Sequence, residues 1–308
     1  MIDLSPIEDE LQNNSQELNE EFRRLFHGRG GIWEDIRSIT VDSIDNVLLL
    51  QFFYDFGQEV EYNVVKLLQK YMQNSRHDTL ILKRRYVRGG ESEVVTGNVT
   101  GEEVAIENGM KFRLNLLSNQ NIGYFGDMKN GRSFIESIAK GKRVLNLFSY
   151  TCGFSLFARR GGASEVVNVD MSKGALSVGM KNHAINDLET KGISFLPYNI
   201  LKSFPKLKRK GPFDIIIIDP PTFQKGSFEA TNDYRKIIQR LPELASNECT
   251  LLACLNSPDH TEEFLKEQIK ELAGEFVYER RLPNLNEYKS LDESRSLKNL
   301  VFQRKMQL

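Results

Sequence analysis

The most constraining feature of this sequence is the regular alternation of strand-like and helix-like segments from Arg143 onward. Parallel sheets need crossover helices between their strands, and this alternation is the pattern that such sheets leave in a sequence. We therefore predict an α/β fold for this half, with a doubly wound parallel sheet. The predicted strands are RVLNLFS, EVVNVDMS, ISFLPYNI, FDIIIIDPP and CTLLACLNS, and the predicted helices are Gly153 to Arg160, Lys173 to Asp187, Asn232 to Leu244 and Thr261 to Ala273.

The first part of the chain has a different pattern, which predicts a smaller α+β domain over residues 1–118. Apolar residues at rough helical spacing over residues 1–26 predict a leading helix, and the glycine-rich turn FHGRGG follows it. The β-rich runs SITVDSI and NVLLLQFF, separated by Asp45-Asn46, predict a hairpin. A helix over Val60 to Met72 and strands over TLILKRRYV, EEVAIEN and MKFRLNLL complete this domain, with a turn at Asn108-Gly109. The second domain is then expected over residues 119–308.

Length and composition fit two globular domains. The 308 residues are 40% hydrophobic and 27% charged, which excludes collagen-like and wholly disordered chains. No apolar run approaches the roughly 20 residues that span a bilayer, and the acidic N-terminus lacks the features of a signal peptide, so we expect a cytoplasmic protein with no membrane partner. The three cysteines are expected to be reduced thiols. The four histidines lack metal-ligand spacing, so no metal site is predicted, and the sequence assigns no oligomeric state.

Charge is distributed unevenly between the two parts of the chain. Residues 1–120 hold 13 basic and 20 acidic side chains, whereas residues 121–308 hold 28 basic and 22 acidic ones. A protein that binds nucleic acid by electrostatics alone usually carries a stronger basic excess. Any contact with nucleic acid is therefore expected to be local.

Ligands of open parallel sheets bind beyond the carboxyl ends of the strands, so the residues that follow each strand are the candidate site. The first strand leads into NLFSYTCG, and the second ends at Asp170, at about the spacing that brings a carboxylate to a ribose diol. This pattern predicts a nucleoside ligand. Only Gly153 remains of the glycines that a pyrophosphate needs, so NAD and FAD are disfavoured and S-adenosylmethionine fits better. The alternative is a tight turn beside a surface aspartate.

The fourth strand ends in Asp219-Pro220-Pro221-Thr222-Phe223. Two prolines stop the ladder and hold an extended backbone at the edge of the sheet that faces the ligand. Asp219 is then placed to accept a hydrogen bond from the exocyclic amino group of a base or from the ammonium of the cofactor, and Phe223 is placed to stack on a flipped base. A proline-rich loop without a role is the alternative.

The segments NQNIGYFGDMKNGR (Asn119 to Arg132), VLNLFSYTCGFSLFA, VDMS and IDPPTF occur in this order. In this combination the chain resembles the bacterial large-subunit ribosomal RNA base methyltransferases that use S-adenosylmethionine, which include cytosine carbon-5 and guanine N7 enzymes. The resemblance covers about residues 40 to 305. It implies a Rossmann-like class I methyltransferase sheet, S-adenosylmethionine as cofactor and ribosomal RNA as partner. The small domain resembles the module that follows the RNA-binding PUA domain of longer members, and a variant without a PUA domain is expected here.

The resemblance also implies roles for single positions. Around the cofactor, Phe148, Ser149 and Tyr150 would surround the methionine part and Asp170 would bind the ribose. Met171 would face the adenine, and Asn199, at a place where the family often has aspartate, could pair with its edge. The segment expected to cross over the cofactor contains Tyr124, Phe125, Asp127 and Arg132. Alternatively, the last two form an ion pair at the domain boundary.

Which atom is methylated depends on whether a cysteine is placed to act as a nucleophile. Carbon-5 of cytosine needs a thiolate that adds to the ring first, and in the resembling cytosine enzymes that cysteine lies just past the fifth strand. Here Asn256 occupies that position, and Cys254 lies two residues earlier, where a small buried hydrophobic residue is the simpler interpretation. A ring nitrogen such as guanine N7 is therefore favoured, because it needs only positioning, with Asn256 as a contact to the base edge.

Basic residues in three parts of the sequence are considered as phosphate contacts. Residues 206–210 precede the fourth strand and are expected to be a solvated face. Lys83, Arg84, Arg85 and Arg88 surround Tyr86 and could form a patch that binds phosphate and stacks bases, or a solvated strand. Arg29 and Lys225 are further candidates. Charge reversal of Arg84 and Arg85 is expected to weaken RNA binding.

The sequence thus predicts an S-adenosylmethionine-dependent methyltransferase that acts on an RNA base, most simply of ribosomal RNA. The alternatives are an N-methyltransferase of a protein or small metabolite and a noncatalytic nucleoside-binding adaptor.

Overall fold

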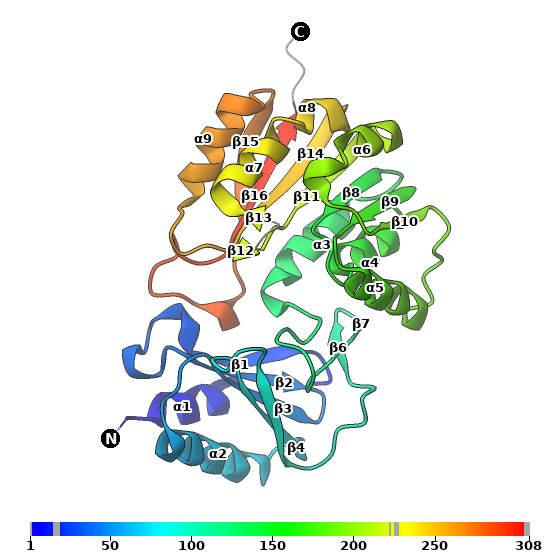
Figure 1. Ribbon diagram of the computed structural model, residues 1–308. Coiled ribbons are helices and arrows are strands. Elements are labelled where there is room, and N and C mark those ends of the chain that lie inside the picture. Colours follow the sequence, from blue (N-terminus) through cyan, green and yellow to red (C-terminus); the bar gives the residue numbers. More distant parts are fainter. Residues whose placement is uncertain (1, 15–18, 222, 225–227, 305–308) are drawn as a thin grey trace. The chain divides into compact units, whose positions relative to one another are not determined.

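The computed structural model describes residues 2–14, 19–221, 223–224 and 228–304, and it describes residues 223–224 and 228–231 by their backbone only. The chain forms two compact units (Figure 1). Unit 1 comprises Met1–Gly126 and Leu285–Asp292, and unit 2 comprises Asp127–Asn284 and Glu293–Leu308. We placed a boundary at 118/119; in this division residues 119–126 also belong to unit 1, and the chain returns to that unit at Leu285–Asp292. A short C-terminal segment without strand or helix periodicity gave no signal of that return.

Unit 1 is built on a five-stranded sheet with strands in sequence order. Its strands are β1 (Arg23–His27), β2 (Ile39–Ile44), β3 (Val47–Phe52), β4 (Thr79–Arg84) and β5 (Glu91–Thr96). The helices α1 (Ser5–Asn14) and α2 (Gln58–Met72) pack their apolar residues against the side chains of one face, including Leu48, Leu50 and Leu82. A separate ladder joins β6 (Val104–Glu107) and β7 (Met110–Arg113), and short 3-10 turns lie at Gly28–Gly30, Glu34–Ile36, Gly126–Met128 and Asn286–Tyr288.

Local sequence accounts for most of unit 1. The predicted hairpins are confirmed, and both turn at residues with positive φ, at Asp45 (51°) and at Asn108 and Gly109 (48° and 77°). The predicted leading helix is correct only as far as Asn14. Phe22 and Leu25 belong to the approach to β1 and to β1 itself, so the apparent helical spacing joined residues of two elements. The strand β5 was missed because it begins with the polar residues Glu91 to Glu93 and its side chains are partly exposed, as at a sheet edge.

Unit 2 contains the predicted doubly wound sheet. Its seven strands are ordered β10-β9-β8-β11-β14-β16-β15, and neighbours from β10 to β14 are parallel. The strands are β8 (Arg143–Leu147), β9 (Glu165–Val169), β10 (Ile193–Leu196), β11 (Phe213–Ile218), β14 (Ala245–Leu255), β15 (Phe276–Leu282) and β16 (Lys298–Arg304). The antiparallel strands β15 and β16 were not predicted. Residues Val277 to Arg280 of β15 are exposed, and the charged residues Glu279 to Arg281 interrupt the segment, so it lacks the longer apolar run that marked the other strands.

Both faces of this sheet are covered, and the four isoleucines of β11 show how. Ile216 and Ile218 lie in a core with residues of α6 (Phe204–Lys210), α7 (Ala230–Ile238), α8 (Leu241–Leu244) and α9 (Glu262–Leu272). Ile215 and Ile217 lie in a second core with residues of α3 (Lys129–Ile138) and α4 (Gly153–Arg160). Alternate side chains of a strand point to opposite faces, so a run of four apolar residues fits a sheet that is buried on both sides. Figure 1 shows these helices beside the strands.

The predicted helices of unit 2 are largely confirmed. α4 has the predicted bounds, α5 (Lys173–Ile185) and α9 differ by one or two residues at their ends, and the long helix predicted over residues 232–244 is divided into α7 and α8. Pro242 lies in the first turn of α8, where its missing N–H costs nothing, and it could not have continued α7. The remaining elements are the 3-10 turn Ile200–Lys202 and the pair β12 (Phe223–Gln224) and β13 (Phe228–Glu229). In the part of the chain that the structure describes, no helix has the length and apolarity of a membrane span.

Candidate active site

The strand order of unit 2 reverses between β8 and β11, and this point defines the candidate site. In the register of the sheet, Leu147 at the end of β8 lies opposite Val169 of β9 and opposite Ile218 of β11. The next residue of each strand, Phe148, Asp170 or Asp219, therefore leaves the sheet at the same edge. Ligands of doubly wound sheets bind beyond the carboxyl ends of the strands where the order reverses. The residues predicted from three separate segments thus share one edge of the sheet.

The loop that follows β8 has an unusual backbone. Phe148, Tyr150 and Cys152 all have positive φ, at 58°, 46° and 64°, although none is glycine. Such residues are uncommon outside glycine and collect at functional sites, where neighbouring contacts hold them. Here the Ser149 N–H donates to the Val169 carbonyl at 3.1 Å, and the Cys152 N–H donates to the Ser149 carbonyl at 2.7 Å. Hydrogen bonds within the protein thus hold the loop, and it leads into α4 at Gly153.

Asp170 connects this loop to the start of α5. Its Oδ2 accepts a hydrogen bond from the Tyr150 N–H at 2.9 Å, and its Oδ1 accepts one from the Ser172 N–H at 2.8 Å. Ser172 in turn caps α5 by accepting from the Ala175 N–H at 3.1 Å. A carboxylate has about four acceptor positions, so this partly exposed group keeps capacity for the two hydroxyls of a ribose.

Two features beyond Asp170 fit an adenine. Met171 is 47% exposed, which is high for so large an apolar side chain and leaves its face available to a ring. Asn199 lies at the end of the segment after β10, and its Oδ1 is buried without a hydrogen-bond partner. A buried acceptor without a partner is costly, and the exocyclic amino group of an adenine would supply the missing donor. The chemistry of these residues thus fits S-adenosylmethionine.

A buried chain of hydrogen bonds between uncharged side chains lies beneath the loop after β8, and we did not predict it from the sequence. Asn146 Nδ2 donates to Asn168 Oδ1 at 2.9 Å, and Asn168 Nδ2 donates to the Ser155 hydroxyl at 3.0 Å. Ser155 Oγ lies 3.1 Å from His183 Nε2, and His183 Nδ1 lies 2.8 Å from the Gly179 carbonyl. A carbonyl only accepts, so Nδ1 carries the proton and Nε2 accepts from Ser155. The available signal was asparagine inside two otherwise apolar strands.

His183 is a fully buried residue of α5. Burial is the main cause that lowers the pKa of its imidazole, so the ring is neutral at neutral pH and fits the hydrogen-bond chain described above. His183 is part of the buried hydrogen-bond chain beneath the loop, and it stabilises the packing there.

Asp219 and Pro220 follow β11 directly. Burial and then the negative charge of Asp127 raise the pKa of the Asp219 carboxyl to about 7, while the positive charge of Arg132 acts in the opposite direction. Arg132 is buried in α3 and Pro220 is buried beside the strand end. Asp127, Arg132 and Asp219 thus form one electrostatic cluster within unit 2. A carboxyl that titrates near neutrality at a strand end is typical of functional sites.

Cys254 has the environment of a structural thiol. It is fully buried in β14, and burial, followed by the charges of Asp219 and Asp127, raises its pKa well above the usual value. Its carbonyl accepts a hydrogen bond from the buried Tyr234 hydroxyl at 3.2 Å. A nucleophilic thiol needs the opposite, a lowered pKa and access to substrate. Asn256, directly after β14, is exposed at the same edge of the sheet.

The remaining predicted site residues are distributed between the two units. Tyr124 and Phe125 belong to unit 1, where Tyr124 is buried between Phe22 and Phe112 and its hydroxyl donates to Glu107 Oε2 at 2.5 Å. The position of Tyr124 is thus explained by packing within unit 1. The side chain of Phe223 and the whole of Lys225 lie outside the described residues.

Two of the basic residues at 83–88, for which we considered a phosphate-binding patch or a solvated strand, are engaged within the protein. Lys83 is fully buried, and its Nζ donates to the Leu116 carbonyl at 3.0 Å and to Ser92 Oγ at 2.9 Å. Arg84 forms ion pairs with three carboxylates, those of Glu61, Glu91 and Glu93. Neither side chain is available for phosphate, so charge reversal of Arg84 would disturb the unit itself.

The basic run at residues 206–210 lies in α6 and is bound to protein groups rather than simply solvated. Lys206 lies over the Tyr198 ring at 4.5 Å, Lys208 pairs with Glu243 at 3.4 Å, and Lys210 donates to Ser194 Oγ at 3.3 Å. The prediction that this run contributes no RNA contact stays a prediction.

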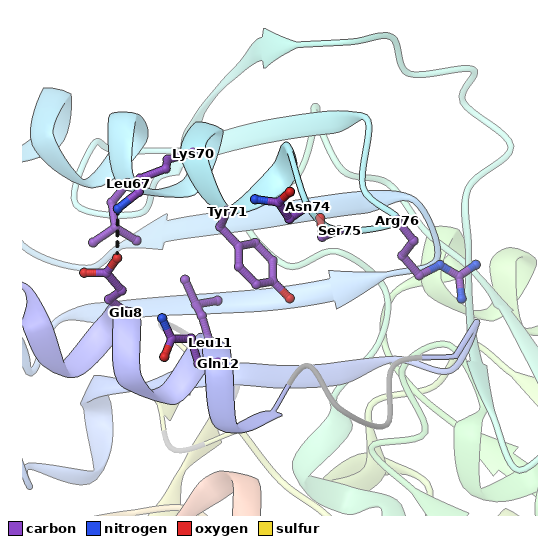
Figure 2. A pocket seen from close by; sticks show the side chains of 9 residues that line it. All are labelled: Glu8, Leu11, Gln12, Leu67, Lys70, Tyr71, Asn74, Ser75 and Arg76. Atoms are coloured by element: carbon purple, nitrogen blue, oxygen red, sulfur yellow. Dashed lines mark hydrogen bonds and ion pairs between the residues drawn. The ribbon is translucent and has the colours of Figure 1, made fainter.

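A separate hollow of about 530 Å³ lies in unit 1 between α1, α2 and the turn that follows (Figure 2). Charged side chains at its rim are paired within the protein, Lys70 with Glu8 at 3.2 Å and Arg76 with Asp45. The hollow therefore offers amide and hydroxyl groups rather than net charge. It is lined by Glu8, Leu11, Gln12, Leu67, Lys70, Tyr71, Asn74, Ser75 and Arg76. Among the residues that the structure describes, no group of three or more histidine, cysteine or acidic side chains could hold a metal ion.

The fold is a doubly wound sheet, and at the edge where its strand order reverses it brings together residues whose chemistry fits a nucleoside and a carboxyl group followed by two prolines. The S-adenosylmethionine-dependent methyltransferase family model matches residues 23–303. The chain belongs to this family of S-adenosylmethionine-dependent methyltransferases.

Several relatives are named for ribosomal RNA. The chain is 30% identical to ribosomal RNA large subunit methyltransferase I of Aeromonas salmonicida over 195 residues, which are 62% of this chain and 49% of that protein. It is 33% identical to the protein of the same name of Photobacterium profundum over 197 residues, with the same coverage. The chain thus spans about half the length of these curated relatives.

Solved structures extend the likeness to nearly the whole chain. An S-adenosylmethionine-dependent methyltransferase from Streptococcus mutans has a TM-score of 0.84 and 26% identity, covering 96% of this chain and 78% of that one. The methyltransferase SMU.776, crystallised with SAH, has a TM-score of 0.85 and 25% identity, covering 97% and 79%. A protein crystallised with SAH thus has a similar arrangement of elements.

Proposed function

We propose that this protein methylates a base of ribosomal RNA in the cytoplasm, with S-adenosylmethionine as methyl donor. The observation that carries the proposal is the juxtaposition of a nucleoside-binding set with a titratable carboxyl group. Asp170 and Asn199 follow β9 and β10, and Asp219 follows β11, so all three leave the sheet at one edge. The names of the relatives supply the acceptor class.

S-Adenosylmethionine, when bound, supplies an electrophilic methyl group on a sulfonium. The protein has to hold this group and bring the accepting atom into line with it, and such positioning alone accounts for several kcal/mol of a barrier. We assign the ribose to Asp170, the adenine edge to Asn199 and the adenine face to Met171. Phe148, Ser149 and Tyr150 form the preorganised loop that receives the methionine part.

The accepting atom is proposed to be a ring nitrogen such as guanine N7. That atom carries a lone pair in the plane of the ring and loses no proton when it is methylated, so it needs no nucleophilic thiol. Asp219 accepts a hydrogen bond from an amino group of the base or of the donor, and Asn256 contacts the base edge. The buried, high-pKa thiol of Cys254 supports this choice over cytosine carbon-5.

Ribosomal RNA from a strain that lacks the gene is the substrate for the direct test. Purified protein and tritiated S-adenosylmethionine should label this RNA, and nucleoside mass spectrometry should find one methylated base that reappears when the gene is restored. The variant Asp219→Asn should lose turnover while calorimetry still detects donor binding. Wild-type protein that binds the donor but labels neither naked RNA nor large subunits would refute the proposal.

Two controls address the alternative functions. If ribonuclease treatment of the labelled extract leaves the methyl groups in protein or small molecules, the acceptor is not RNA. If 5-fluorocytosine-containing RNA forms a covalent adduct with the protein, a thiol takes part and cytosine replaces the ring nitrogen as target. A chain that binds the donor and transfers nothing would be the noncatalytic adaptor.

A further inference from the structure

The hydrogen-bonded ladder between β11 and β14 ends where the candidate site begins. Its last pair in the register joins Ile218 to Ala253. Asp219 follows, and then Pro220 and Pro221, which have no N–H to donate. These two prolines cannot pair with carbonyl groups of β14, so a hydrogen bond that joins the two strand ends here has to come from another group.

The hydroxyl of Tyr234 supplies that hydrogen bond. Its oxygen lies 3.2 Å from the Cys254 carbonyl oxygen of β14 and 3.4 Å from the Ile218 carbonyl oxygen of β11. A hydroxyl carries one proton, so the two carbonyls share it, and both distances exceed the roughly 2.8 Å of a hydrogen bond with a single acceptor. Tyr234 thus bridges the two strands, at the residue before Asp219 and two residues before Asn256.

Tyr234 is fixed by its surroundings. It is a residue of α7 with no exposed surface, and it lies in one core with Ile216 and Ile218. Burial is the main cause that raises the pKa of its hydroxyl well above the usual value, followed by the charges of Cys254 and Asp219. The hydroxyl therefore keeps its proton, which it donates to the two carbonyls.

A second tyrosine with a buried hydroxyl gives a comparison. The hydroxyl of Tyr71, in unit 1, has no hydrogen-bond partner among the residues that the structure describes. Loss of the Tyr71 oxygen therefore breaks no such hydrogen bond. Loss of the Tyr234 oxygen, in contrast, takes a donor from the carbonyls of Ile218 and Cys254, two fully buried residues. The two tyrosines thus form a matched pair for an experiment.

We propose that Tyr234 is a positioning residue of the active site, whose hydroxyl holds the ends of β11 and β14 together and thereby sets where Asp219 and Asn256 meet the substrate. This inference rests on the proposed function, which assigns the contacts with the base to these two residues. Tyr234 acts through the backbone that leads to them. Catalysis by positioning is sensitive to distance, since a displacement of about 1 Å can cost about a hundredfold in rate.

The test compares Tyr234→Phe with two controls. Tyr234→Phe removes one oxygen and keeps the ring that fills the core, so it should fold. Tyr71→Phe makes the same chemical change in unit 1, and Ile238→Val removes one methylene from the same helix and core as Tyr234. The single-turnover rate with tritiated donor and saturating large-subunit RNA from a deletion strain measures methyl transfer. We expect this rate to fall about tenfold in Tyr234→Phe and to stay within about twofold of wild type in both controls.

Binding measurements separate positioning from general damage. In Tyr234→Phe the calorimetric affinity for S-adenosylmethionine and the Kd for RNA should stay within about twofold of wild type, because the lost interaction serves the reacting geometry. Asp170 and Asn199, which we assign to the donor, follow other strands. If Tyr234→Phe does not fold, Tyr234→Met takes its place, because methionine is an adaptable apolar side chain without a hydroxyl.

The outcomes distinguish this inference from the proposed function. A variant without the Tyr234 hydroxyl that transfers methyl groups at the wild-type rate would show that this residue only fills the core. An equal loss of rate in Ile238→Val would lead to the same conclusion, because that variant keeps the hydroxyl. In both cases the methyltransferase proposal stands. Wild-type protein that labels no RNA would overturn the proposed function itself.

Discussion

The buried chain of hydrogen bonds beneath the loop after β8 gives the sharpest stability prediction. Ser155 stands in its middle, accepting from Asn168 Nδ2 at 3.0 Å and donating to His183 Nε2 at 3.1 Å. Ser155→Ala removes one oxygen atom and leaves a donor and an acceptor without partners, because Asn168 and His183 are both fully buried. Each such loss costs about 1–3 kcal/mol, so we expect a decrease of about 2–5 kcal/mol in the free energy of unfolding.

Urea denaturation followed by circular dichroism measures this decrease, with Ser137→Ala as the matched control. Ser137 is an exposed serine of α3 whose hydroxyl donates to the Phe134 carbonyl at 2.7 Å within its own helix, so its replacement should change the free energy by less than about 0.5 kcal/mol. The same hydrogen bonds support the loop that we propose to bind the donor, so the affinity of Ser155→Ala for S-adenosylmethionine should fall several-fold. A stability loss below about 1 kcal/mol would show that the unpaired groups find new partners and would refute the reasoning.

Three further predictions concern the site itself. Burial and the charge of Asp127 raise the pKa of Asp219 to about 7, and we propose that its carboxylate form accepts the hydrogen bond. The rate of methyl transfer should therefore rise between pH 6 and 8 in a rate–pH profile. Asp127→Asn removes the neighbouring negative charge, so it should shift this rise to lower pH. Replacement of Cys254 by alanine should leave kcat within about twofold of wild type in the tritium assay, because its thiol is buried and protonated; a large loss would restore the thiolate mechanism. In Gly179→Ala the new Cβ would lie 2.4 Å from the Cys152 sulfur, so calorimetry should find weaker donor binding, and the added change Cys152→Ala should recover part of it.

Most of the fold could be predicted from the sequence because its signals are local. The run Ile215 to Ile218 predicts a strand buried on both faces, and each of its side chains lies in one of the two cores. The two antiparallel strands β15 and β16 gave no comparable signal. The place of β16 in the sheet depends on its pairing with β14, which joins residues far apart in sequence, such as Val301 opposite Leu252. In β15, the charged residues Glu279 to Arg281 follow only two exposed apolar residues.

The same contrast between local signals and long-range contacts holds for the candidate site. Asp170, Asn199 and Asp219 each follow a strand, and the rule that ligands meet the carboxyl ends of parallel strands is enough to bring them together. The hydrogen bonds of Arg85 could not be predicted, because its partners Gln51 and Asn121 are 34 and 36 residues away and meet it only through the register of unit 1. Sequence alone also placed Lys83 on the surface, whereas the strand buries it.

The site also explains how a nucleoside can be held with few glycines. A pyrophosphate needs N–H groups presented by a glycine-rich turn, but S-adenosylmethionine has no phosphate, so the turn only has to provide shape and a ribose contact. Phe148, Tyr150 and Cys152 adopt positive φ without being glycine, and each such residue costs on the order of 1 kcal/mol or more. The hydrogen bond from Tyr150 to Asp170 and the buried chain below the loop offset that cost. Tyr150→Gly relieves the strain of a positive φ, so we expect a small increase in the free energy of unfolding. The variant also lacks the Tyr150 ring, so we expect a lower affinity for the donor. If the free energy of unfolding and the affinity both fall to a similar extent, Tyr150 acts only as a packing residue.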